Sequence, residues 1–143
     1  MSKAEMLQNW YDEVWVEGDL TAIEKYFAPD TQAVGVIQNF QMGIDDFRDL
    51  VFAMRNMVDS LTVKVAKAVE NGDWLAGLIQ VNATVKDTGA PVEVFGQVMA
   101  RVEGDKFVET YNQFDFIGFF EQTGQMPPDT LPICMTGHRL DMA

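Results

Sequence analysis

Apolar residues near the N-terminus recur at the spacing of a helix that buries one face. They form a single stripe at intervals of three and four residues: Leu7, Trp10, Tyr11, Val14 and Trp15. Ser2 and Glu5 form a capping box at the start of this stripe, and Gly18 suits the position after a helix end. The pattern predicts one amphipathic helix in this segment.

The next segment predicts a short helix, a strand and a longer helix. Asp19 can cap the short helix, which Pro29 ends. Residues 31–37 form a short apolar run that predicts a strand, and Gly43 marks a turn after it. From residue 44 to about residue 57 the helical spacing returns, with acidic residues near the N-terminal end, where the helix dipole favours them.

From Leu61 onward the apolar residues alternate with polar or small ones, which is typical of strands. The sequence Asn71-Gly72-Asp73 is a hairpin signal, and two further turn sequences follow it. The pattern predicts four long strands: one from residue 61, then 74–86, 92–102 and 106–117. The tail from residue 118 contains three prolines, so we expect it to add only a short helical turn and extended chain.

Helices gathered first, with antiparallel hairpins after them, are typical of an α+β domain. We expect the N-terminal helices to cover one face of a long, curved, mostly antiparallel sheet. A curved sheet covered on one side leaves a concave space, which is a natural pocket for a small molecule.

The composition restricts the class of partner. A chain of 143 residues suits one domain with a substantial core. Ten Lys and Arg residues against 22 Asp and Glu residues give a net charge of −12, which disfavours nucleic acids and anionic membranes as partners. The N-terminal residues turn polar at once, and no apolar run resembles a signal peptide or a membrane span, so we expect a cytoplasmic protein.

Cysteine and histidine, which commonly bind transition metals or act in catalysis, occur once each. Cys134 is the single cysteine, so the chain can form neither an intramolecular disulfide nor a cysteine-based zinc site. His138 is the single histidine and lies in the tail, which argues against a histidine-centred triad and a multi-histidine metal site. No phosphate-binding loop or dinucleotide fingerprint occurs. We therefore expect no metal and no organic cofactor.

Short motifs along most of the chain point to a known group of proteins. In chain order they are Gly18-Asp19-Leu20, Tyr26-Phe27-Ala28-Pro29-Asp30, Gly43-Ile44-x-x-Phe47, Glu70-Asn71-Gly72-Asp73, Gly104-Asp105-Lys106-Phe107-Val108-Glu109-x-Tyr111-x-x-x-Asp115 and Gln122-x-Gly124. This set resembles the SnoaL-like polyketide cyclase group of the nuclear-transport-factor-2-like superfamily, whose cystatin-like fold is an α+β cone. The resemblance implies such a domain over residues 1–125 and a proline-containing tail over 126–143. It is more specific for fold than for reaction, because the superfamily hosts enzymes and binding modules alike.

The resemblance implies a catalytic role for Asp115. In SnoaL-like cyclases the aspartate that ends the last strand is the acid/base of an intramolecular aldol ring closure, and the motif places Asp115 there. A carboxyl group in an apolar pocket can serve both proton transfers if desolvation raises its pKa. The structural alternative is that Asp115 caps the turn at Gly118 or pairs with Arg101. Members of the group often bring a histidine into the pocket, and here another side chain would have to supply that second polar partner.

Ketosteroid isomerase, an enzyme of the same superfamily, allows a second comparison. Tyr11 matches the position of its oxyanion tyrosine, and Gln97 falls near its second oxyanion donor. Gly35 stands where its base aspartate would be, so the resemblance implies a different mechanism for this chain. For Tyr11 the alternative is a core tyrosine with a hydrogen-bonded hydroxyl group.

Other candidate substrate-binding residues follow from their neighbours. Trp15 lies one helical turn after Tyr11 and either packs in the core or contacts a ligand. By strand alternation Gln97 and Met99 share one face, which suits either a pocket wall or a contact with a second subunit. Asn112 could orient substrate oxygen atoms.

Three functions remain open from the sequence. The first is cofactor-free acid/base chemistry, of the aldol-cyclase or isomerase type, on a small apolar carbonyl compound. Asp115 would be catalytic, and the substrate-binding residues would be Tyr11, Trp15, Gln97, Met99 and Asn112. The second is a non-catalytic small-molecule-binding domain, and the third is a protein-interaction module. Because the strands are apolar on both faces, we also expect a homodimer.

Overall fold

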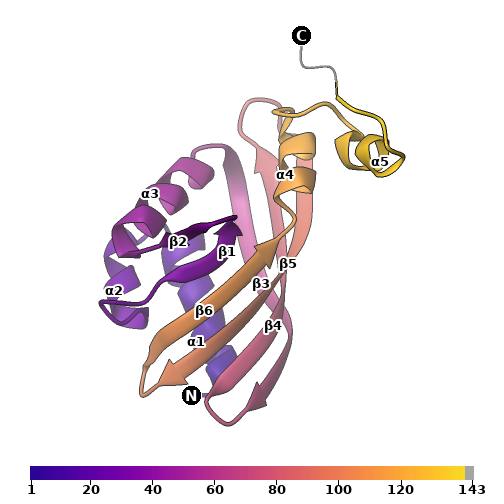
Figure 1. The fold of residues 1–143 in the computed structure, drawn as a ribbon. Coiled ribbons are helices and arrows are strands. Elements are labelled where there is room, and N and C mark those ends of the chain that lie inside the picture. Colours follow the sequence, from indigo (N-terminus) through magenta and orange to yellow (C-terminus); the bar gives the residue numbers. More distant parts are fainter. Residues whose placement is uncertain (141–143) are drawn as a thin grey trace.

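The computed structural model describes residues 1–140, which form a six-stranded sheet with helices (Figure 1). The strands are β1 (Ala33–Ile37), β2 (Phe40–Met42), β3 (Val58–Asn71), β4 (Trp74–Val85), β5 (Pro91–Glu103) and β6 (Lys106–Phe114). The helical elements are α1 (Lys3–Trp10), the π-helical η1 (Tyr11–Val16), the 3₁₀-helical η2 (Leu20–Ala22), α2 (Ile23–Tyr26), α3 (Ile44–Arg55), α4 (Phe116–Thr123) and α5 (Thr130–Met135). The strand order is β2-β1-β6-β5-β4-β3, and all neighbours are antiparallel except β1 and β6.

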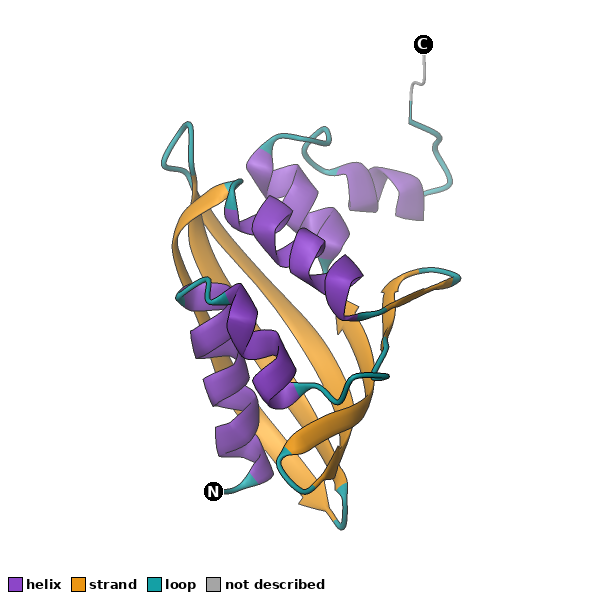
Figure 2. Ribbon diagram, turned by 90° about the vertical axis from the view of Figure 1, so that its left-hand side faces the viewer, coloured by secondary structure: helices purple, strands orange, loops and turns teal. Residues whose placement is uncertain are grey.

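The helices α1, α2 and α3 lie on one face of the sheet. Figure 2 looks onto this helical layer with the long strands behind it. Helix α4 follows directly on β6 at one end of the sheet, and α5 lies beyond it (Figure 1). The concave face of the sheet is therefore closed by helices along its length and by α4 at one end.

The two faces of β5 have opposite environments. The buried side chains alternate strictly along the strand: Val92, Val94, Gly96, Val98, Ala100 and Val102. The residues between them, including Phe95, Gln97 and Met99, are exposed on the outer face. Since successive side chains of a strand point to opposite faces, the valine-rich set is the one that faces the helices.

Aromatic rings tie the helical layer to the sheet. Trp10 stacks on Phe27 with ring centroids 4.7 Å apart, and Phe47 from α3 packs against both rings. Phe107 of β6 meets Phe27 edge-on at 6.2 Å. Such ring pairs stabilise a core beyond the area that they bury, so these four residues hold α1, α3 and β6 around one centre.

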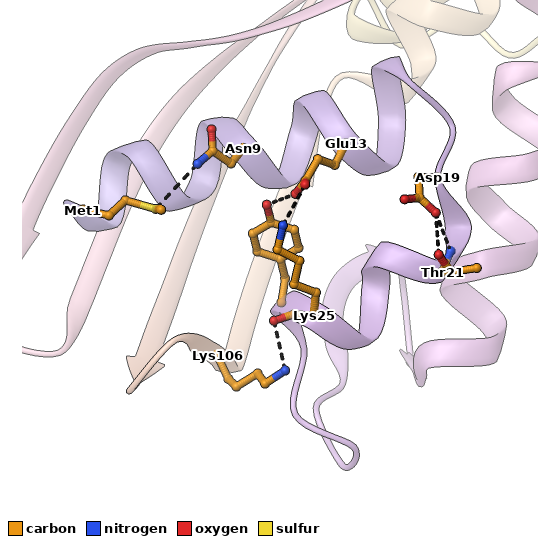
Figure 3. Close-up of polar contacts among 8 residues, drawn as sticks. Met1, Asn9, Glu13, Asp19, Thr21, Lys25 and Lys106 are labelled. Carbon is orange, nitrogen blue, oxygen red and sulfur yellow. Dashed lines mark hydrogen bonds and ion pairs between the residues drawn. The ribbon is translucent and has the colours of Figure 1, made fainter.

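Polar contacts fix the helices relative to one another and to β6 (Figure 3). Glu13 of η1 pairs with Lys25 of α2 at 2.8 Å and accepts a hydrogen bond from the Tyr26 hydroxyl group. Lys106 at the start of β6 donates to the backbone carbonyl groups of Glu24 and Lys25 at 2.7 and 2.9 Å. The end of α2 is thus held from two sides.

The predicted N-terminal helix continues beyond α1 as the π-helical element η1. Arg55 of α3 donates from Nε to the carbonyl of Trp15 at 2.7 Å and from Nη2 to the carbonyl of Val16 at 3.2 Å. A Cβ at Gly18, where φ is +76°, would lie 2.4 Å from Arg55 Nη1. A glycine is therefore required here both by the backbone conformation and by the guanidinium group that lies against it.

Three strands of the sheet, β2, β3 and β6, differ from the expectation. Strand β2 is additional, and it pairs with β1. Strand β3 begins at Val58, earlier than expected, and its register shifts between Asp59 and Thr62 and again between Val65 and Lys67. These irregularities break the simple alternation, and Val69 is exposed as a result.

The predicted last strand is also too long, because β6 ends at Phe114 and a helix follows. Asp115 is the N-cap residue of α4, and its Oδ1 accepts from the backbone N–H of Gly118 at 2.8 Å. Phe116, Phe119 and Phe120 have the spacing of one helix face, so a signal for this helix was present in the sequence.

The tail beyond α4 contains α5, a helix of six residues. The division into a domain over residues 1–125 and a tail over 126–143 stays a prediction. In the part of the chain that the structure describes, no helix combines the length and apolar character needed to cross a bilayer. Residues 1–140 also contain no group of three or more His, Cys, Asp or Glu side chains placed to hold a metal ion.

Candidate functional site

A pocket of about 100 Å³ lies between the inner face of the sheet and the helices. Nine of its lining residues are aromatic: Trp10, Tyr11, Trp15, Phe27, Phe47, Phe107, Phe114, Phe116 and Phe119. Oxygen atoms and charges come from few side chains: Tyr11, Arg55, Thr110, Asn112 and Asp115. Small-molecule sites typically combine such an apolar lining with a few polar groups that orient the ligand.

Tyr11 brings an unpaired hydroxyl group to this pocket. Its side chain is 5% exposed, and burial alone raises its pKa far above the usual range. The hydroxyl group forms no hydrogen bond to another group within residues 1–140. No side-chain nitrogen or oxygen atom of these residues is both fully inaccessible and without a partner, so the Tyr11 oxygen atom keeps some accessible surface. The hydroxyl group must therefore open onto the pocket. Tyr11 is thus a core tyrosine, as the alternative had it, but its hydroxyl group has no hydrogen-bond partner within residues 1–140.

Strand β6 supplies two further polar side chains on its inner face. Thr110 is buried and donates from Oγ1 to the carbonyl of Gln32 at 3.4 Å. Asn112 donates from Nδ2 to the carbonyl of Val34 at 3.3 Å and to Thr110 Oγ1 at 3.4 Å. The bonds to Gln32 and Val34 join β6 to β1 and to the residue before it. Both bonds of Asn112 use its Nδ2, so its Oδ1 can accept a hydrogen bond from a ligand.

Asp115 lies where β6 ends and α4 begins, and it is exposed. Besides the bond from Gly118 N to Oδ1, a Cβ at Gly118 would lie only 2.3 Å from Oδ2. Glycine at position 118 therefore leaves room for this carboxylate. The structural alternative, a cap at Gly118, is present, whereas Arg101 pairs with Glu103 and Glu109 instead. Because Asp115 also lines the pocket, the cap does not remove it from the site.

The structure brings four of the six predicted site residues together. Tyr11, Trp15, Asn112 and Asp115 all line the pocket, although their roles towards a substrate stay predictions. Gln97 and Met99 do not reach it, so the prediction that they form part of the pocket wall is wrong. Both lie on the outer face of β5, while Val98 between them lines the pocket. Their position fits the alternative of a surface available to a second subunit.

Gly35 shows why the base of ketosteroid isomerase has no counterpart here. Its φ is +91°, and a Cβ would lie 2.5 Å from the carbonyl oxygen of Asn112. The close parallel approach of β1 to β6 leaves no room for a carboxylate at this position. Among residues 1–140, the only carboxylate that lines the pocket is that of Asp115.

Several lining residues were missed from the sequence. Arg55 is the last residue of α3, where a basic side chain is ordinary and gives no signal of a pocket. Thr110 looked like one of many polar residues in a strand. Phe116 and Phe119 follow Asp115 closely in the sequence, and the helical spacing that brings them to the pocket could have identified them.

Comparison with known proteins agrees with this architecture. The sequence profile of the family described as SnoaL-like polyketide cyclase matches residues 5–123. A proposed polyketide cyclase from Acidithiobacillus ferrooxidans superposes with a TM-score of 0.71 at 22% sequence identity, over 87% of this chain and 96% of that chain. Wild-type IdmH from Streptomyces antibioticus, also a proposed polyketide cyclase, gives 0.72 at 20% identity, over 87% and 99%.

A third similar structure is a protein of ketosteroid isomerase-like fold from Catenulispora acidiphila, solved in complex with trimethylamine. Its TM-score is 0.71 at 19% identity, over 90% of this chain and 98% of that chain. At these identities the likeness shows the fold, which is the expected nuclear-transport-factor-2-like α+β cone. None of the curated proteins matches this chain. Because the family profile extends from the first helix through α4, the chain belongs to the SnoaL-like polyketide cyclase family.

Proposed function

We propose that this chain catalyses cofactor-free acid/base chemistry, of the aldol-cyclase or isomerase type, on a small apolar carbonyl compound held in the pocket. The observation that carries the proposal is the buried hydroxyl group of Tyr11, which has no partner within residues 1–140 and opens onto an aromatic pocket. A buried donor left unpaired costs stability, and a ligand oxygen atom would satisfy it.

The proposed reaction uses two groups of the pocket. The Asp115 carboxylate removes a proton from a carbon next to a carbonyl group, and the Tyr11 hydroxyl group donates a hydrogen bond to the oxygen of the resulting enolate. The enolate carbon then forms a bond to a second carbonyl carbon of the same molecule. The proton held by Asp115 passes to the alkoxide that this bond formation creates. In an isomerase, the proton would return to another carbon instead.

The size of the pocket supports a small substrate. Its volume of about 100 Å³ is below the ~150 Å³ of an apolar cavity that accepts one benzene molecule. The pocket therefore suits a portion of substrate no larger than about one ring, and any larger portion would have to lie outside it. Asn112 Oδ1 would accept a hydrogen bond from a hydroxyl group of such a substrate.

The test is hydrogen–deuterium exchange at the α-carbons of cyclohexanone, followed by NMR in D₂O near neutral pD. We expect the protein to accelerate exchange and Asp115→Asn to reduce this acceleration by roughly 10²–10⁴-fold, the usual contribution of a general base. Asparagine is an equally good N-cap residue, so α4 is retained. Asp105→Asn, in the turn between β5 and β6, makes the same change of charge away from the pocket and is the control.

The second candidate function is ligand binding without turnover, and the exposure and capping role of Asp115 favour it. In that case cyclohexanone would shift the NMR signals of the pocket without any acceleration of exchange. A loss of less than tenfold in Asp115→Asn would likewise reject the catalytic role.

We also propose that the outer face of the sheet pairs with a second copy of the chain. Phe95, Met99 and Tyr111 are 45%, 49% and 43% exposed there, although they lie on the central strands β5 and β6. Tyr111 stacks on Trp74 of β4 at 6.5 Å, which extends the apolar surface. An apolar area in the middle of a sheet favours association with a matching surface.

A further inference from the structure

The pocket combines aromatic rings with one carboxylate at the end of β6. The ring of Phe116 lies 6.2 Å from that of Phe114, tilted by 44°, and stacks on Phe120 at 6.4 Å. Asp115 lies between Phe114 and Phe116 in the chain, and all three line the same pocket. Only one oxygen of this carboxylate, Oδ1, accepts the hydrogen bond that caps α4. Oδ2 is left for a ligand.

The charges around the pocket favour a positive ligand over a negative one. The lining contains one cation within residues 1–140, Arg55, and its guanidinium group is bound to the carbonyl groups of Trp15 and Val16. Those carbonyl groups are at the C-terminal end of a helix, where partial negative charge already offsets a cation. The net charge of −12 adds a field that attracts cations and repels anions.

We propose that this pocket binds an alkylammonium cation, a tertiary or quaternary amine whose substituents lie against the phenylalanine rings and whose charge faces Asp115. The faces of aromatic rings carry partial negative charge and attract such cations. An alkylated ammonium ion has an apolar surface and is weakly hydrated, so an apolar pocket accepts it at low desolvation cost. This inference goes beyond the proposed reaction, because the ligand is a cation and not a carbonyl compound. A cation at Oδ2 would compete with a carbonyl substrate.

The test compares choline with 3,3-dimethylbutan-1-ol, which has the same shape and hydroxyl group but no charge. Binding of each is measured by isothermal titration calorimetry at about 0.15 M salt, where long-range attraction to the net charge is screened. We expect choline to bind at least about tenfold more tightly than the neutral alcohol. Asp115→Asn should remove most of this preference, and it should leave the affinity for the alcohol unchanged.

Two further variants separate the site from general electrostatics. Asp105→Asn removes the same charge outside the pocket and should leave the preference for choline intact. Phe116→Leu keeps an apolar side chain and should reduce the preference several-fold, because the ring face is lost. Equal affinities for the two probes in the wild type, or equal effects of Asp115→Asn and Asp105→Asn, would overturn the proposal. Neither result would bear on the cyclohexanone exchange, so the cation site and the proposed reaction can fail separately.

Discussion

Two tyrosines in this protein are equally buried but differ in what their hydroxyl groups contact. Tyr11 and Tyr26 are both 5% exposed and belong to the same core. Tyr26 donates to the carboxylate of Glu13, whereas the Tyr11 hydroxyl group has no partner within residues 1–140. Replacing each by phenylalanine removes one oxygen atom from a tyrosine of the same exposed fraction. The pair therefore isolates the contribution of the hydrogen bond.

The two replacements should change the free energy of unfolding differently. A hydrogen bond to a charged group stabilises by about 1.5–3 kcal/mol, so Tyr26→Phe should lose about that amount. Tyr11→Phe loses no hydrogen bond and removes a poorly solvated hydroxyl group, so it should range from no change to a gain of about 1 kcal/mol. Urea denaturation of both variants measures these values if the dependence on urea concentration is unchanged. The melting temperatures should differ in the same order, by about 3 °C per kcal/mol.

A loss of more than about 1 kcal/mol in Tyr11→Phe would refute this reasoning. It would mean that the Tyr11 hydroxyl group has a partner inside the fold, and its proposed role as a donor to a ligand would lose its basis. A gain in stability together with slower cyclohexanone exchange would instead show a group that is kept for function at a cost in stability.

Three further changes test other parts of the molecule. Gly96→Ala should lower the free energy of unfolding by about 1–3 kcal/mol in urea denaturation, because the added methyl group would meet the Phe114 ring at 2.2 Å. Hydrogen bonds from Tyr111 and Arg101 lower the pKa of Glu109, so its stabilisation is present above an unfolded pKa of about 4.3 and is lost as the pH falls through the lower folded value. Glu109→Gln should therefore lower the melting temperature near pH 7 and have little effect near pH 2. Sedimentation at micromolar concentration should give twice the chain mass and Met99→Glu a monomer, whereas a wild-type mass near 16 kDa would contradict the dimer.

Local sequence signals account for most of the secondary structure. Periodicity and turn residues act over a few positions, and they correctly predicted the helix α3 and the hairpin of β3 and β4 at Asn71-Gly72-Asp73. The motif around Asp115 indicated the family, because such motifs retain the turns and packing positions of a fold. The order of helices and hairpins then sufficed for the α+β cone.

Which residues line the pocket depends on contacts between distant parts of the chain, and short-range patterns do not reveal these contacts. Alternation correctly placed Gln97 and Met99 on one face of β5, but the side on which the helices pack decides which face is the inner one. The pairing of β1 with β6 joins residues near 33 and 110, and no short-range pattern shows it. Asp115 would share the outer face with Tyr111 if β6 continued, and the change from strand to helix after Phe114 is what brings it to the pocket.

The irregular edges of the sheet bear on how copies of this protein can associate. At one edge β2 has only three residues, and at the other β3 has two register shifts together with the exposed Lys64 and Lys67. Short, bulged and lysine-bearing edge strands are poor templates for the addition of further strands. The proposed contact between copies would thus use the outer face, where a symmetric pair closes on itself. The proposed dimer would in this way cover the apolar outer face of the sheet without growing into fibres.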